Sequence, residues 1–350
     1  MGLPAEDRVK GGLLICCDFE KLNLSGADSS ARTHLSKAHS MTLARNVADN
    51  EVDTSHIEPD HFGKVIDISG GHDIIECSRC GFRHASPLPT AEELEATYAE
   101  DYYTEEKPDY LVHAAEDAEW AQLSYDDRLN KLHSLLGYKG RLLDIGSGPG
   151  FFLERAASTG WDAQGIEPSC QASQFAKERG LTVTNEFFGP ETASKLGQFD
   201  AIVMTNMLEH VPAPIELVEQ AFELLCPGGV VCVTVPNDYS GFQTSLREGG
   251  TRPWWLAAPH HLNYFDFDSL ERLLTRVGGL LRGRMTSFPM EMFALLGDDY
   301  IAEPEIGRGL HNKRKHFDQA LNPAIRESFY ASLSTSGLGR EAIVFAQKPE

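Results

Sequence analysis

Short apolar runs alternate with amphipathic stretches along residues 139–350, and this alternation predicts strands followed by helices. The run at 199–205 is apolar on both faces, as expected for a strand in the middle of a sheet. The expected strands are 141–145, 162–166, 181–184, 199–205, 230–235, 280–287 and 342–346, and the expected helices are 151–158, 169–179, 215–225 and 268–277. We therefore predict an α/β fold with a Rossmann-like, doubly wound, seven-stranded and mostly parallel sheet.

The part of the chain before residue 139 does not follow this alternation and divides into three stretches. Residues 1–50 are polar and lack a sustained period, so we expect a poorly ordered leader. Residues 51–100 combine short β-like runs with four histidines and a Cys-x-x-Cys pair, which indicates a small β-rich module. Residues 101–138 place apolar side chains at helical spacing and predict a helical connector. Within the main domain, the insertion at about 288–320 is expected to form a lid.

The net charge and the number of cysteines limit which binding partners and which cellular compartment the chain can have. The chain has 52 acidic and 31 basic residues, and 31 − 52 gives a net charge of −21 at pH 7. Nucleic acids and anionic membranes are bound through Lys and Arg, so this balance disfavours both. No run approaches about 18 apolar residues, and the N-terminal run 13–17 is too short for a secretory signal. Seven cysteines, an odd number, fit reduced thiols, and we expect a cytoplasmic protein that acts on a small molecule.

The turn after the first predicted strand carries three glycines. Gly146 permits a tight turn, Gly148 lets the backbone approach a ligand, and Gly150 allows close packing of the following helix. Glu167 ends the second strand, seventeen residues after Gly150, where a carboxylate can accept both hydroxyls of a ribose. The glycine spacing differs from the G-x-G-x-x-G of dinucleotide folds, and Asp144 suits a cationic ligand better than a pyrophosphate.

This glycine turn resembles motif I of the class I S-adenosylmethionine-dependent methyltransferases. Four further stretches extend the resemblance from about residue 138 to the end of the chain: 167–169, 199–203, 206–211 and 227–229. The resemblance implies S-adenosylmethionine as cofactor, with its methionine part near Asp144, its ribose on Glu167 and its adenine near Asn185. The implied cofactor residues are Asp144, Gly146, Ser147, Gly148, Gly150, Glu167, Asn185, Thr205 and Asn206.

The implied reaction is in-line transfer of a methyl group to a small-molecule acceptor, with a hydroxyl oxygen as the favoured target. A sugar nucleotide or a secondary metabolite is the expected acceptor. A hydroxyl acceptor needs a base, and ligands of open α/β sheets bind at the carboxyl ends of the strands. Histidine titrates near neutral pH, and we favour His261, then His260, then His210. The alternative is that these histidines only line the loop or cap the next helix.

Other functions stay open on the sequence alone. A catalytically silent cofactor-binding or scaffold protein would bind S-adenosylmethionine tightly without turnover. A nucleotide-dependent oxidoreductase on the same fold class would instead be stabilised by NAD. An RNA methyltransferase is disfavoured by the acidic balance. The basic run 313–316 is either a solvated face or a grip for a diphosphate or carboxylate of the acceptor, centred on Arg314.

A second resemblance lies in the N-terminal module. Its Cys-x-x-Cys stretch is similar to that of a subgroup of these methyltransferases that carries a small zinc ribbon before the catalytic domain. Such a ribbon normally has two knuckles, since tetrahedral zinc takes four ligands. Here Cys77 and Cys80 form one knuckle, and His56 and His61 stand where the other is missing. A Cys2His2 zinc site of these four residues and a degenerate, metal-free ribbon are the alternatives. The remaining histidines of the module are expected to be ordinary surface or hydrogen-bonded residues: His72 and His84.

Overall fold

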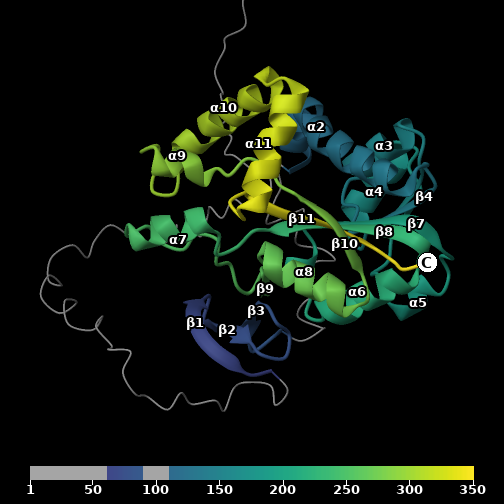
Figure 1. Ribbon diagram of the computed structural model, residues 1–350, viewed down its shortest axis with the longest axis horizontal. Helices are drawn as coiled ribbons and strands as arrows, with labels where there is room; N and C mark the ends of the chain where they lie inside the picture. The colour runs from purple at the N-terminus through teal and green to yellow at the C-terminus, as the bar shows by residue number, and fades with distance from the viewer. Residues whose placement is uncertain (1–60, 90–109) are drawn as a thin grey trace, which may run out of the picture.

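A computed structural model describes residues 61–89 and 110–350, and their elements form two sheets (Figure 1). The predicted leader 1–50 and His56 lie outside the described residues. The larger sheet has seven strands, which confirms the predicted fold class. Their order is β10 (Leu280–Met285), β11 (Glu341–Gln347), β8 (Leu225–Pro236), β7 (Phe199–Thr205), β4 (Arg141–Ile145), β5 (Asp162–Ile166) and β6 (Val183–Thr184).

The pairing of these strands brings the predicted site to one edge of the sheet. Strands β4 to β8 run parallel, while β11 is antiparallel to both β8 and β10. In the register, Ile145 of β4 pairs with Ile166 of β5 and with Met204 of β7. The residues that follow these positions therefore leave the sheet side by side at the carboxyl ends of the strands.

Helices cover both faces of this sheet, because successive residues of a strand point to opposite sides. Leu142 packs under α2 (Tyr110–Leu136) and α3 (Phe151–Ser158). Its neighbour Leu143 belongs to the cluster that also contains residues of α6 (Pro214–Glu223) and α8 (Phe267–Arg276). The remaining helices near this sheet are α4 (Cys170–Glu178), the short α5 (Pro190–Ala193) and the 3-10 turn η2 (Leu208–His210).

A separate apolar cluster lies between α7 (Gly241–Glu248), the α9 turn (Glu291–Leu295) and α10 (Gly307–Ala320). The 3-10 turn η3 (Pro304–Ile306) and α11 (Pro323–Thr335) complete this part of the chain, which runs beyond the expected insertion. The yellow helices α10 and α11 lie beside α2 in Figure 1. The cluster consists of Leu246, Trp254, Trp255, Phe288, Met290, Tyr300, Ile301 and Leu310. Among the residues that the structure describes, no helix is both long and apolar enough to span a membrane.

The smaller sheet joins the N-terminal module to the larger domain. Three strands come from the module: β1 (Gly63–Ser69), β2 (His72–Cys77) and β3 (Arg83–Ser86). The fourth is β9 (Asn263–Tyr264), which follows the histidine-containing loop of the larger domain. It pairs antiparallel with β3, and this sheet therefore crosses the boundary that the sequence suggests near residue 100.

A buried ion cluster fastens α10 to α2 and supplies a first prediction. Asp117 is 1% exposed, accepts a hydrogen bond from Lys315 and lies 3.1 Å from His311 Nε2. Burial alone raises the pKa of a carboxyl, but the bonds from His311 and Lys315 outweigh it and lower the pKa of Asp117 to about 2. The cluster therefore stabilises the fold above pH 4, and this contribution is lost as the pH falls towards 2.

We expect Asp117→Asn to lower the free energy of unfolding at pH 7 by about 2 kcal/mol. Urea denaturation followed by circular dichroism measures this change. Glu116→Gln is the matched control, because Glu116 pairs with Arg308 from a side chain that is 53% exposed, and exposed pairs contribute little. Equal effects of the two substitutions would show that the buried cluster does not stabilise the fold.

Candidate functional site

The glycine turn between β4 and α3 has the backbone that its sequence predicts. Gly146, Gly148 and Gly150 have φ values of 74°, 53° and 81°, a region that side chains disfavour. A Cβ on Gly150 would stand 2.6 Å from Leu181 Cδ1 and 3.1 Å from Ala176 Cβ, so a side chain at the start of α3 would force these neighbours to shift. Ser147 Oγ is buried beside this turn without a hydrogen-bond partner among the described residues.

Glu167 connects the end of β5 to the glycine turn. Its Oε2 accepts a hydrogen bond from Gly148 N at 2.7 Å, and its Oε1 accepts one from Ser169 N at 2.9 Å. Burial raises the pKa of Glu167, and the two backbone bonds oppose that shift. An ionised carboxylate can accept about four hydrogen bonds, so Glu167 keeps acceptor sites for the hydroxyls of a ligand.

A buried acid and a buried base lie next to this turn. Asp144 is on β4, where burial raises its pKa to about 7, the Arg128 charge opposes the shift and the Glu167 charge adds to it. Arg128 reaches in from α2 and donates a hydrogen bond to Thr205 Oγ1 at 2.9 Å. Its guanidinium also lies over the ring of Phe152. An acidic side chain, Asp144, and a basic one, Arg128, therefore both lie near the carboxyl end of the sheet.

Two further predicted cofactor residues, Asn185 and Asn206, also lie at the carboxyl ends of the strands of the larger sheet. The Asn185 amide donates to Glu167 O and Pro168 O, so it braces the bend after β5. Asn206 follows β7 with a φ of 49°, and its amide nitrogen lies 3.4 Å from Glu341 Oε1.

The three predicted histidines are neighbours. His261 is buried and its ring meets that of His210 edge to face, with 4.8 Å between centroids. His210 follows β7 in η2, and its Nδ1 lies 2.8 Å from the backbone oxygen of His260. Of the three, His261 lines a narrow pocket at the ends of β7 and β8, with an accessible volume of about 20 Å³.

This pocket combines carboxylates with aromatic rings. Asp238 and Glu291 are each 2% exposed, and each has one carboxylate oxygen without a hydrogen-bond partner among the described residues. Burial and the charges of Glu209 and Glu291 raise the pKa of Asp238 well above its usual range. Trp254 and Trp255 also line the pocket. A buried acid that keeps its proton can donate a hydrogen bond as well as accept one.

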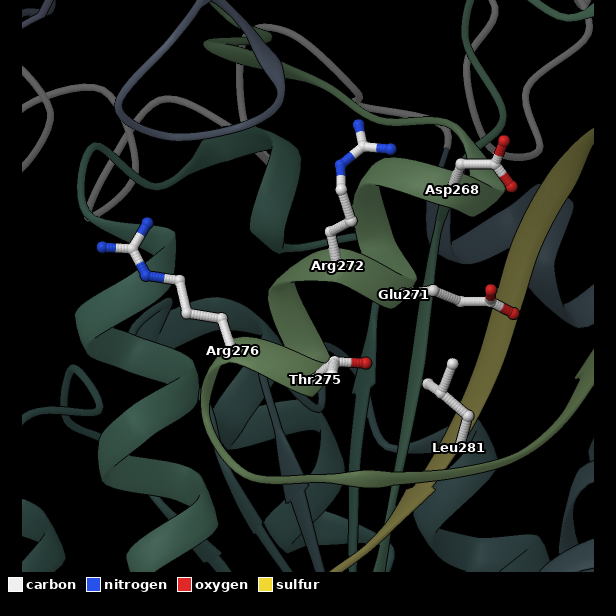
Figure 2. Close-up of a pocket in the computed structure, with 6 residues that line it drawn as sticks. All are labelled: Asp268, Glu271, Arg272, Thr275, Arg276 and Leu281. Atoms are coloured by element: carbon white, nitrogen blue, oxygen red, sulfur yellow. The ribbon is translucent and has the colours of Figure 1, made fainter.

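A second hollow lies on the outer side of α8 (Figure 2). Its charged side chains are engaged in holding neighbouring elements. Arg272 and Arg276 project from the helix and donate to Gly81 O and Arg79 O of the module. Glu271, on the other side of the helix in Figure 2, pairs with Arg284 of β10. This hollow therefore marks the contact between module and domain, at a different place from the glycine turn.

The cysteines of the module lie in a cluster with two histidines. One ligand atom from each of His61, Cys77, Cys80 and His84 lies within 4.8 Å of the others. His84, expected from the sequence to be an ordinary residue, is buried and faces His61, with 3.1 Å between His84 Nε2 and His61 Nδ1. Burial lowers the pKa of His84 to about 4, so its imidazole is neutral at pH 7. His72 instead lies with its Nδ1 3.1 Å from Pro87 O.

Sequence reasoning missed several residues of the two sites. Arg128 carried a signal, because it is a charged residue beside the apolar stripe of a predicted helix. Glu291 carried a similar one, as an acid between two methionines. Arg314, for which a solvated face and a grip on an acceptor anion were the two alternatives, is instead buried with its guanidinium over Trp120.

Comparisons with known proteins agree with the predicted family. Residues 118–278 match a family model described as a methyltransferase domain. The ubiquinone biosynthesis O-methyltransferase of Actinobacillus pleuropneumoniae serotype 7 (strain AP76) is 35% identical over 117 residues, which are 31% of this chain and 49% of that protein. The enzyme of that name from Paraburkholderia phymatum is 40% identical over 103 residues, 28% of this chain and 44% of that protein. The chain thus spans about half the length, or less, of these curated relatives.

A solved structure, that of a SAM-dependent methyltransferase from Archaeoglobus fulgidus, is 15% identical with a TM-score of 0.44. The likeness covers 67% of this chain and 99% of that one. Over residues 118–278, the match to the family model agrees with the resemblance that the glycine turn and the later motifs predict.

Proposed function

We propose that this chain, whose residues 118–278 form a class I S-adenosylmethionine-dependent methyltransferase domain, methylates a hydroxyl group of a small molecule. The observation that carries the proposal is the position of Glu167. Its carboxylate is fixed by the glycine turn, keeps free acceptor sites, and lies at the sheet edge where the His261 pocket opens. The cytoplasmic location predicted from the sequence stays part of this proposal.

The residues at the glycine turn fit the cofactor. S-adenosylmethionine supplies an electrophilic methyl group on a positively charged sulfur, together with an amino-acid ammonium and carboxylate. Glu167 would accept hydrogen bonds from the ribose hydroxyls, and Asp144 would attract the ammonium. Arg128 would hold the carboxylate, since guanidinium groups bind carboxylates well. The buried Ser147 hydroxyl, without a partner among the described residues, offers one more polar contact.

Cofactor binding should depend on pH through Asp144. The pKa of this carboxyl is raised to about 7, so lowering the pH from 7.5 to 5.5 protonates it and removes the charge that attracts a cation. We expect the dissociation constant of S-adenosylmethionine to rise about 20-fold over this range. The amino group of the ligand stays protonated there. Calorimetric titration at several pH values measures the change.

The matched variant is Asp144→Asn, which keeps the shape of the side chain and cannot ionise. It should bind more weakly than the parent at pH 7.5 and show a nearly flat pH dependence. A parent protein whose affinity does not change between pH 5.5 and 7.5 would exclude Asp144 from contact with the cationic end of the cofactor.

The acceptor side suits a hydroxylated ring. Trp254 and Trp255 line the pocket with apolar ring atoms against which a ring of the acceptor can pack. Asp238 and Glu291 offer buried oxygens that can exchange hydrogen bonds with hydroxyl or amino groups. A diphosphate would meet three carboxylates here, those of Asp238, Glu291 and Glu341, against the single guanidinium of Arg340. Arg314 is placed over Trp120 instead of at the pocket. We therefore favour an uncharged or cationic, hydroxyl-bearing metabolite over a sugar nucleotide whose phosphates enter this pocket.

His261 is the proposed general base. It lines the pocket, and His210 packs against its ring and restricts its orientation. His261 would accept the proton of the acceptor hydroxyl while the oxygen takes up the methyl group. The narrow pocket would admit little water beside the acceptor, and the fixed side chains would align the acceptor oxygen.

Incubation with a methyl-labelled cofactor tests the proposed function. The full chain is mixed with labelled S-adenosylmethionine and a pool of hydroxylated metabolites, and mass spectrometry then identifies products that carry the label. Labelled oxygen-methylated products are the expected result. Tight cofactor binding without any labelled product would instead favour the silent cofactor-binding alternative.

A further inference from the structure

We propose that His61, Cys77, Cys80 and His84 bind one zinc ion, and that this site holds the histidines of the acceptor side in place through the pairing of β3 with β9. The ligand set differs from the one expected from the sequence, because His84 takes the place of His56. The zinc-binding part is independent of the proposed function. The coupling part rests on it, since it concerns the residues assigned there to the acceptor.

The spacing of the four donor atoms matches a tetrahedral zinc site. Zn–S bonds of about 2.3 Å and Zn–N bonds of about 2.0 Å place neighbouring ligand atoms about 3.3 to 3.8 Å apart. His61 Nδ1 lies 3.1 Å from His84 Nε2, 3.4 Å from Cys80 Sγ and 3.8 Å from Cys77 Sγ. Two sulfur and two imidazole nitrogen donors are a common zinc set, and soft thiolates disfavour magnesium and calcium.

The orientation of His84 is fixed by its second ring nitrogen. His84 Nδ1 lies 2.8 Å from Ala85 O, so it carries the proton and donates it to this carbonyl. The lone pair of Nε2 then points at the cluster. This arrangement is typical of histidines that bind zinc, in which the outer nitrogen is held by a hydrogen bond to the backbone.

The Cys-x-x-Cys turn presents its two sulfur atoms to the same point. Gly81 has a φ of 79°, and its N–H donates to Cys77 O at 2.9 Å, which closes the turn. The N–H of Cys80 points to Cys77 Sγ at 3.4 Å, which holds the two cysteines on the same side of the turn. Both cysteines are free thiols, and Arg272 and Arg276 of α8 donate hydrogen bonds to two carbonyls of the same turn.

The proposed zinc site is joined to the acceptor side by a short series of hydrogen bonds. Ala85, the residue after the ligand His84, donates its N–H to Leu262 O at 2.7 Å. Leu262 in turn donates its own N–H to Glu209 O at 2.7 Å. The Asn263 amide donates to Leu208 O at 2.8 Å and to Val211 O at 2.6 Å, one bond on each side of Glu209 and His210.

These hydrogen bonds restrict the position of the proposed base, His261, on two sides. His261 immediately precedes Leu262, and its ring packs against that of His210 in η2. A zinc ion that fixes β3 would therefore fix β9, and through Leu262 and Asn263 it would fix η2 and the loop that carries His261. Gly70 of the β1–β2 turn meets the same loop, since a Cβ there would stand 2.1 Å from Ala258 O.

Metal analysis and cobalt substitution test the ligand set. We expect about one zinc per purified full-length chain and, after exchange, the visible absorption of tetrahedral cobalt with two thiolates. His84→Gln keeps most of the volume of the side chain and should lose this absorption and most of the zinc. His56→Gln and His72→Gln are the controls and should retain both. A metal-free parent that also fails to take up cobalt, or a His84→Gln variant that keeps the full cobalt spectrum, would overturn the ligand set.

Amide hydrogen exchange followed by mass spectrometry tests the coupling. Removal of the metal from the full chain by a chelator should raise exchange at least tenfold in residues 208–211 and 260–265. Peptides that contain the glycine turn 144–150 should change little, and they serve as the internal control. Asn263→Ala should retain the metal and still raise exchange in 208–211. Unchanged exchange in both segments after verified metal loss would overturn the coupling, whether or not the chain methylates an acceptor.

Discussion

Replacement of His261 by alanine is expected to lower kcat for the acceptor by 10²- to 10⁴-fold, the usual contribution of a general base. The effect should fall on kcat, because His261 lines the acceptor pocket, whereas the cofactor residues Asp144 on β4 and Glu167 after β5 lie next to the glycine turn. Steady-state kinetics with the acceptor found in the labelling experiment measure this loss. Calorimetry should give a cofactor affinity within about threefold of the parent.

Two controls separate proton transfer from positioning. His260→Ala should lower kcat less than fivefold, because His260 offers its backbone oxygen to His210, and this atom survives the substitution. A more acidic analogue of the acceptor ionises without help, so the loss in His261→Ala should shrink with such an analogue. A loss that is the same for both acceptors, or that appears only in KM, would contradict the role of His261 as base.

The strands and the glycine turn were predictable because their signals are local. Strands β4 and β7 are mostly apolar runs next to polar or glycine residues, and β4, β5 and β7 have the predicted bounds. Gly150 and Glu167 could be recognised because both belong to a single βαβ unit. In such a unit, the glycine turn needs residues without side chains, and the end of the second strand carries the acid that binds a ribose. Their neighbourhood then follows from the parallel pairing of β4 with β5.

The parts that escaped prediction depend on contacts between distant segments. β9 consists of two residues, Asn263 and Tyr264, and no periodicity can reveal so short a strand. It exists because β3, about 180 residues earlier, offers an edge for pairing. The place of His84 in the cysteine cluster follows from the same sheet. In α11 the described helix buries little beyond Ser334, so it lacks the apolar stripe that would have marked it.

Glu167→Ala is expected to weaken the binding of S-adenosylmethionine and of S-adenosylhomocysteine by about 100-fold or more. The substitution removes the acceptor of two ribose hydroxyls, and a hydrogen bond to a charged group contributes about 1.5 to 3 kcal/mol. It also removes the bonds that tie Gly148 and Ser169 together, which adds to the loss by loosening the turn. Calorimetric titration measures the affinity, and Glu178→Gln, at the end of the helix α4 that follows Glu167, should bind like the parent.

A double-mutant cycle distinguishes contact with the ribose from an effect on the turn alone. In the parent, the 2′-deoxy analogue of S-adenosylhomocysteine should bind at least tenfold more weakly than S-adenosylhomocysteine, because one hydroxyl of the pair is missing. In Glu167→Ala, the two ligands should bind almost equally, since the partner of that hydroxyl is gone. If the analogue loses as much affinity in the variant as in the parent, Glu167 only shapes the turn, and the ribose must be held by another group.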